Sequence, residues 1–167
     1  MRLASFEAIA EALEKAKVRY LVAGGLAVNA HGFLRFTKDV DLVIQLQTDN
    51  LRRALAAVEA LGYRPAIPVS FDQFADPEQR DSWVRDKGMQ VFQLWSDAHP
   101  ETSIDVFVTE PFEFDSEYAR AMIKPLRENL PVRFVSIPAL IRMKELANRP
   151  QDQIDIEHLR MRMEDHE

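Results

Sequence analysis

Hydrophobic residues recur along the chain at helical spacing in four longer segments and in a short one at residues 26–33. In residues 3–16 the apolar positions alternate with acidic and basic ones, which is typical of an amphipathic helix packing on a sheet. A second helical pattern covers residues 51–61. Near the C-terminus the pattern predicts a helix over residues 136–148 and another over residues 151–162, with Pro150 breaking the chain between them.

Short apolar or alternating runs bounded by turn residues predict strands. These strands cover residues 20–23, 40–46, 89–95, 104–108 and 132–135. A turn through Asp97 and Pro100 connects the third and fourth strands, which predicts a hairpin. Residues 66–88 carry no regular pattern and are expected to form a long irregular loop. Residues 109–131 are less legible, and residues 119–126 fit either a strand or a helix, with Pro125 limiting both.

Length and composition narrow the class of protein. The 167 residues predict a single domain spanning residues 1–167, and the lack of cysteine excludes disulfides, thiolate zinc sites and cysteine nucleophiles. The formal net charge of −6 argues against a general nucleic-acid coat, although basic residues between 120 and 149 leave an RNA substrate open. Without an apolar run of membrane-spanning length or a signal-peptide pattern, we expect a cytoplasmic protein with no membrane partner.

Two features of residues 21–42 point to nucleotide chemistry. Gly24 and Gly25 lie between a predicted strand and a short predicted helix, where glycine lets the backbone approach a phosphate closely. Asp39 and Asp41 alternate with apolar residues on the next strand, so both carboxylates project from the same face. Two carboxylates that close repel each other, and a bound divalent cation is the usual remedy.

Other polar residues near these motifs have more than one interpretation. Asp105 interrupts a strand of β-branched and aromatic residues, and such a broken local rule is typical of a functional position. Arg35, Thr37 and Lys38 precede the aspartates and either contact phosphate or sugar, or balance the carboxylates and face solvent. We expect His31 to be a packed or hydrogen-bonded side chain rather than a catalytic one.

Together these motifs resemble the nucleotidyltransferase superfamily of the polymerase-beta type. The shared pattern is an apolar residue, Gly-Gly, a spacer, Asp-apolar-Asp-apolar and a later carboxylate on a neighbouring strand. The family signature also allows Ser at the position of Gly25. The chain is most similar to small AbiEii-like toxins and to lincosamide or aminoglycoside nucleotidyltransferases, which share a late helical stretch like residues 141–159. The resemblance implies an α+β fold with a mixed β-sheet backed by helices and a C-terminal helical pair.

The resemblance also implies an activity. A protein of this kind is a metal-dependent enzyme that transfers a nucleoside monophosphate from a nucleoside triphosphate to a hydroxyl group. Asp39, Asp41 and Asp105 would bind Mg²⁺ or Mn²⁺ and act as the catalytic residues. Gly24 and Gly25 would cradle the terminal phosphates through backbone N–H groups.

Further site residues and partners follow from the same resemblance. Lys144 and Arg149 are implied triphosphate contacts, and Asp152 and Asp155 are implied supports of the late helices; all four are also explained by ion pairing along a helix. The acceptor would be RNA, a protein or a small molecule, and a toxin-antitoxin component would have an antitoxin protein as partner. The sequence does not choose the nucleotide or the acceptor.

Two other functions are compatible with parts of the pattern. A non-catalytic relative would bind nucleotide, or none, and act through a protein partner, but such a protein is expected to lose one of the three carboxylates. A sugar transferase with an Asp-x-Asp metal site would normally require a longer chain and a parallel nucleotide-binding sheet. The retained carboxylates and the Gly-Gly turn favour the nucleotidyltransferase.

Overall fold

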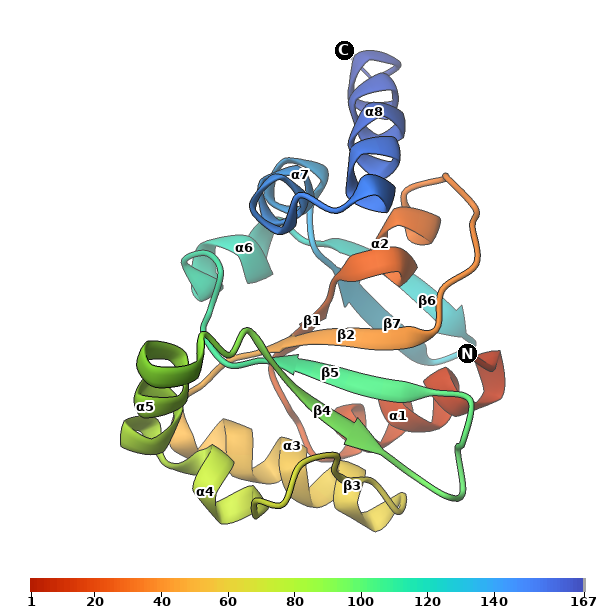
Figure 1. The fold of residues 1–167 in the computed structure, drawn as a ribbon. Helices are drawn as coiled ribbons and strands as arrows, with labels where there is room; N and C mark the ends of the chain where they lie inside the picture. Colours follow the sequence, from red (N-terminus) through yellow and green to blue (C-terminus); the bar gives the residue numbers. More distant parts are fainter. Residues whose placement is uncertain (167) are drawn as a thin grey trace.

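The strands form one mixed sheet in the order β3-β4-β5-β2-β1-β7-β6 in the computed structural model, which describes residues 1–166 (Figure 1). Two neighbouring pairs run parallel, β2 with β5 and β1 with β7, and the other pairs are antiparallel. The strands are β1 (Tyr20–Val22), β2 (Asp39–Ile44), β3 (Arg64–Pro65), β4 (Val91–Trp95), β5 (Ser103–Phe107), β6 (Met122–Arg127) and β7 (Leu130–Phe134).

Helices cover both faces of this sheet. Figure 1 shows α1 and α3 on one side and α2, α7 and α8 on the other, while α4 and α5 lie beside the β3–β4 edge. The helices are α1 (Leu3–Lys15), α2 (Gly24–Ala30), α3 (Thr48–Ala60), α4 (Phe71–Ala75), α5 (Pro77–Lys87), α6 (Phe114–Arg120), α7 (Ile137–Ala147) and α8 (Pro150–Glu164). Within residues 1–166, no helix has both the length and the apolar character needed to cross a membrane.

The alternation of side chains in β2 and β5 separates the core from the polar face. Val40 and Leu42 on β2, and Ile104 on β5, are fully buried in the main hydrophobic core. The residues that alternate with them along the two strands, including Asp41 and Asp105, keep partial solvent contact. Because successive side chains of a strand point to opposite faces, the buried aliphatic residues orient the carboxylates away from the core.

Most of the predicted elements are confirmed. The α+β class, the mixed sheet, the β4–β5 hairpin and the C-terminal helical pair are all present. The helix after the first strand begins at Gly24, two residues earlier than the sequence pattern indicated. His31 is hydrogen-bonded as expected, with its Nε2 lying 2.8 Å from the carbonyl oxygen of Val135.

The expectation of an irregular loop over residues 66–88 is wrong. This segment holds α4 and α5, each started by a capping side chain: Ser70 accepts from the Gln73 backbone N–H, and Asp76 accepts from the N–H of Glu78. Hydrophobic periodicity did not reveal these two helices, because a few aromatic contacts to the sheet hold them in place rather than a continuous apolar face. The rings of Phe74 and Trp83 stack with Phe92 of β4 at centroid distances of 4.2 and 5.9 Å.

The structure also resolves the alternatives for residues 119–126. Helix α6 ends at Arg120, and β6 begins at Met122 as the outer strand of a hairpin with β7. Pro125 is tolerated because β6 is an edge strand with an irregular register between Pro125 and Arg127. The short strand predicted at residues 132–135 is the second half of that hairpin.

Candidate active site

A pair of carboxylates lies at the centre of the polar face. In the parallel β2–β5 ladder, Asp41 is directly opposite Asp105, and Asp39 is opposite Ser103. Side chains opposite each other on neighbouring strands are close enough to interact. The sheet therefore brings the three predicted carboxylates onto one face, with Asp41 and Asp105 as immediate neighbours.

The glycine turn at the end of β1 closes tightly over this pair. Gly24 has φ +60°, and a Cβ atom there would overlap the Oδ2 atom of Asp41. At Gly25 a Cβ atom would lie 2.6 Å from Thr37 Oγ1 and 2.8 Å from Thr37 Cβ. Both glycines are needed for close approach to other side chains, and Thr37 occupies the space that a larger residue 25 would need.

Burial and mutual repulsion make these carboxylates unusual. Burial, then the charges of Asp105 and Asp39, raise the pKa of Asp41 to about 7. The pKa of Asp105 is raised mainly by burial and next by Asp39, and its Gln93 neighbour on β4 opposes the rise only in part. One oxygen of Asp105, Oδ1, is buried without a hydrogen-bond partner. These groups favour a positive counter-charge between them.

Asp41 and Asp105 offer carboxylate oxygens that suit a divalent cation. Among residues 1–166, no group of three or more His, Asp or Glu side chains forms a ready metal cluster. Asp41 and Asp105 nevertheless line one cavity together, and the unpartnered oxygen of Asp105 is the kind of hard ligand that Mg²⁺ prefers. The pair fits a divalent cation, with Asp39 next along β2.

The cavity beside this pair has both polar and apolar lining residues. Its volume is about 680 Å³. The polar lining includes Gly24, Asp41 and Asp105 together with Lys144, Arg149 and Asp152 of the α7–α8 region. The apolar lining comes from Val84, Met89, Val91, Phe107, Leu140, Met143, Leu146 and Ala147. A ligand that is anionic at one end and apolar at the other would match this lining.

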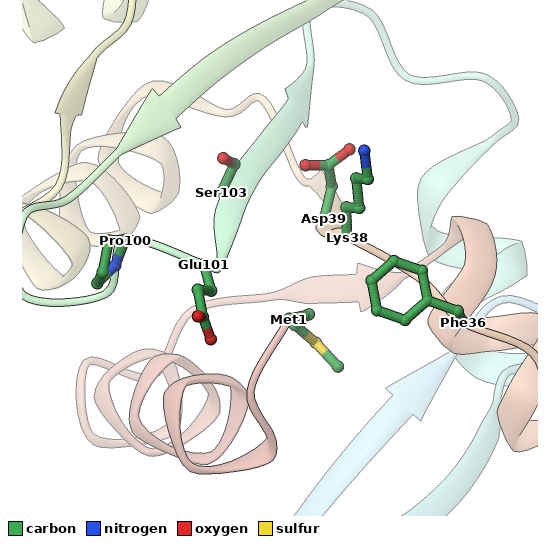
Figure 2. Close-up of a pocket in the computed structure, with 7 residues that line it drawn as sticks. All are labelled: Met1, Phe36, Lys38, Asp39, Pro100, Glu101 and Ser103. Atoms are coloured by element: carbon green, nitrogen blue, oxygen red, sulfur yellow. The ribbon is translucent and has the colours of Figure 1, made fainter.

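A second cavity, of about 530 Å³, lies next to Asp39 (Figure 2). Figure 2 shows that Phe36, Lys38 and Asp39 come from the segment entering β2, and that Glu101 and Ser103 come from the segment entering β5. Met1 and Pro100 complete the lining. Asp39 and Ser103 precede Asp41 and Asp105 on the same two strands, so the second cavity lies at the start of these strands and the first cavity lies beside the carboxylate pair.

The predicted phosphate-binding cations have different environments. Arg35 and Lys144 form ion pairs with Asp155, each at 2.8 Å, and Lys144 is buried. Arg149 pairs with Asp152 at 2.9 Å, yet its side chain stays 73% exposed and lines the first cavity. Of these three cations, only Arg149 combines a cavity position with high exposure.

Two other predicted residues, Thr37 and Lys38, lie in the loop before β2, and two residues near the site were not predicted. Lys38 lines the second cavity, whereas Thr37 packs on Gly25 and lines neither cavity. The sequence did not single out Gln93, which pairs with Asp105, or Glu101, which lines the second cavity. The hairpin pattern carried a signal for Gln93, because its register pairs Gln93 with Asp105.

Comparison with known proteins establishes the fold. The sequence matches no known family profile and no curated protein. The structure is similar to that of the antibiotic-resistance factor ANT(2'')-Ia in solution, with a TM-score of 0.58 and 19% identity, covering 99% of this chain and 84% of that one. It is also similar to the lincomycin-bound lincosamide antibiotic adenylyltransferase LnuA, with a TM-score of 0.57 and 13% identity, covering 88% and 89% of the two chains.

A third similar structure is ANT(2'')-Ia in complex with adenylyl-2''-tobramycin. Its TM-score is 0.54 and its identity is 18%, covering 94% of this chain and 86% of that one. The predicted polymerase-beta-type nucleotidyltransferase fold is therefore confirmed.

The crowding at Gly25 predicts that this chain does not accept the Ser found in the family signature. We expect Gly25→Ser to lower the free energy of unfolding by about 1–3 kcal/mol, because the new side chain overlaps Thr37. The double variant Gly25→Ser/Thr37→Ala should recover part of this loss. Urea unfolding of the two variants measures it, and a Gly25→Ser protein as stable as the wild type would contradict the packing described here.

The raised pKa of Asp41 predicts an unusual pH dependence. Between about pH 4 and 7 the unfolded chain has released this proton while the folded protein keeps it, so stability falls as the pH rises and levels off above 7. Asp41→Asn removes the penalty and should be more stable than the wild type at pH 8, on the order of 2 kcal/mol. The difference should close towards pH 4.

Urea unfolding at several pH values between 4 and 8 tests this prediction. The matched control is Asp97→Asn, which removes an exposed carboxylate and should show no such stabilisation. An Asp41→Asn protein that is less stable than the wild type at pH 8 would show that the charged Asp41 carboxylate does not destabilise the fold.

Proposed function

We propose that this protein is a metal-dependent nucleotidyltransferase that transfers an adenylyl group from ATP to a hydroxyl group of a small molecule. The observation that carries the proposal is one cavity in which Gly24, Asp41 and Asp105 face Lys144 and Arg149. This combination supplies carboxylates for a metal and cations for phosphates. It occurs in a fold shared with nucleotidyltransferases that modify antibiotics.

The polar and apolar residues that line the first cavity suit the two parts of a nucleotide. The triphosphate would lie beside Arg149 and Lys144, which offset its charge, and beside Gly24, which allows close approach of the backbone. The nucleoside would pack on the apolar lining, which includes Leu140 and Met143 of α7. ATP is proposed as donor because the similar structures are named for adenylyl transfer.

Asp41 and Asp105, with Asp39 beside them, are the residues that would hold Mg²⁺ or Mn²⁺. When bound, the ion supplies charge neutralisation at the phosphates and carboxylates. Asp105 is the proposed base, because it lies directly opposite Asp41 and, with Oδ1 holding the metal, its other carboxylate oxygen would accept the proton. The acceptor oxygen bonds to the α-phosphorus as the bond to the bridging oxygen breaks, pyrophosphate leaves, and the hydroxyl proton passes to Asp105.

The second cavity is the proposed acceptor site. An in-line displacement needs the attacking hydroxyl and the leaving pyrophosphate on opposite sides of the α-phosphorus. Asp41 and Asp105 line the first cavity, while Asp39 and Ser103 line the second, so a nucleotide in the first leaves the second for the acceptor. A cavity of about 530 Å³ suits a small molecule, and the net charge of −6 does not favour an RNA chain.

Calorimetric titration with ATP, with and without Mg²⁺, tests the nucleotide site. We expect Mg²⁺-dependent binding to the wild type and at least tenfold weaker binding to Asp41→Asn/Asp105→Asn, which loses both proposed metal ligands. Asp97→Asn should bind like the wild type, because this exposed carboxylate lies outside both cavities.

A folded wild-type protein that binds no ATP would overturn the proposal. Mg²⁺-dependent binding with no pyrophosphate release, tested across small hydroxylated compounds that include lincomycin and tobramycin, would favour the non-catalytic alternative instead.

A further inference from the structure

Asp155 on α8 is a completely buried carboxylate that four hydrogen bonds surround. Arg35 donates to it twice, from Nε to Oδ1 and from Nη2 to Oδ2, each at 2.8 Å. Lys144 Nζ donates to Oδ2 at 2.8 Å, and Gln151 Nε2 donates to Oδ1 at 2.9 Å. A carboxylate of one helix thus joins the loop before β2, helix α7 and the start of α8.

On the loop side, Arg35 holds the segment that leads into the carboxylate strand. Its Nη1 donates to the carbonyl oxygen of Phe36 at 2.9 Å, and its backbone N–H donates to Asn29 Oδ1 at 2.9 Å. The same Nη1 lies 3.2 Å from the place that a Cβ atom of Gly25 would occupy. The guanidinium group therefore packs against the glycine turn while its other nitrogens bind Asp155.

On the helix side, the same carboxylate holds a cation of the cavity wall. Lys144 lies between two buried acids, 2.8 Å from Asp155 and 3.3 Å from Asp152. Asp152 in turn accepts from Arg149 Nε at 2.9 Å. Lys144 and Arg149 both line the first cavity, so one continuous set of ion pairs connects its cations with the loop before β2.

The energetics of this network favour a role in geometry over one in stability. Burial alone would raise the pKa of Asp155, but hydrogen bonds from Arg35, Lys144 and Gln151 outweigh burial and leave the pKa below its ordinary value. A buried ion pair adds little net stability, because removing the charges from water costs about as much as their attraction returns. A two-point contact between guanidinium and carboxylate does fix direction as well as distance.

We propose that Asp155 is a positioning residue that sets the two walls of the nucleotide cavity relative to each other. Through Arg35 it holds the loop against the glycine turn, and through Lys144 it holds the wall formed by α7. The choice of a nucleotide as the ligand rests on the proposed function. The coupling between the two walls rests on the contacts alone.

The chain offers a matched control for simple helix packing. Arg160 of α8 pairs with Glu145 of α7 at 3.0 Å, with both side chains at least half exposed and outside the cavity. Glu145→Gln removes an ion pair between the same two helices without touching Asp155. It should therefore leave the glycine turn unchanged.

The test compares Asp155→Asn, Arg35→Lys and Glu145→Gln. Arg35→Lys keeps the charge and loses the two-point contact, so it probes position even if Asp155→Asn fails to fold. We expect amide NMR signals of Gly24, Gly25 and Thr37 to shift in the nucleotide-free Arg35→Lys protein and to stay in place in Glu145→Gln. ATP affinity should fall at least tenfold in Arg35→Lys.

A double variant adds a readout that loss of stability alone would not give. If the two residues act through one contact, Arg35→Lys/Asp155→Asn should weaken ATP binding no more than the stronger single change. Independent, multiplying effects would overturn the proposal. So would an Arg35→Lys protein that is unfolded, because the network would then serve folding, or one that keeps wild-type glycine signals.

The result separates this inference from the proposed function. If the wild type binds no ATP, the proposed function fails, and the nucleotide-free amide signals still decide whether Asp155 couples the two walls. If the wild type binds ATP and Arg35→Lys binds it equally well with unchanged glycine signals, the positioning role is wrong while the function stands.

Discussion

The side-by-side placement of Asp41 and Asp105 is the constraint on which the rest of the site depends. The parallel register of β2 and β5 places Asp41 opposite Asp105. The aliphatic residues that alternate with them along the two strands are buried in the core. The backbone positions of Asp41 and Asp105 cannot move apart without moving a buried strand. Burial, and then the neighbouring carboxylates, raise the pKa of Asp41 to about 7, and Oδ1 of Asp105 is buried without a hydrogen-bond partner among residues 1–166. A bound cation would relieve both.

The surrounding elements accommodate this pair instead of separating it. Gly24 closes over Asp41 where any larger residue would collide, so the turn after β1 follows the carboxylate closely. The cations are Lys144 of α7 and Arg149 just before α8, and the buried acids Asp152 and Asp155 hold them in place. Negative charge thus lies on the sheet, and positive charge lies on a helical region that an ion pair connects to the loop before β2.

The centre of the site could be predicted from sequence, and its surroundings could not. Asp39 and Asp41 alternate with aliphatic residues, and Asp105 breaks an apolar strand, so strand periodicity places all three on one face. The contact between Arg35 and Asp155 joins residues 120 positions apart, and no local pattern encodes it. Helices α4 and α5 were missed because isolated aromatic rings anchor them, although their capping residues were visible in the sequence.

The most direct measurement is a crystal structure of the protein grown with Mn²⁺ and an ATP analogue that cannot release pyrophosphate. We expect anomalous density for the metal between the carboxylates of Asp41 and Asp105, with the phosphates next to Gly24 and Arg149. A nucleotide bound elsewhere, or bound in the cavity with no metal at these aspartates, would contradict it.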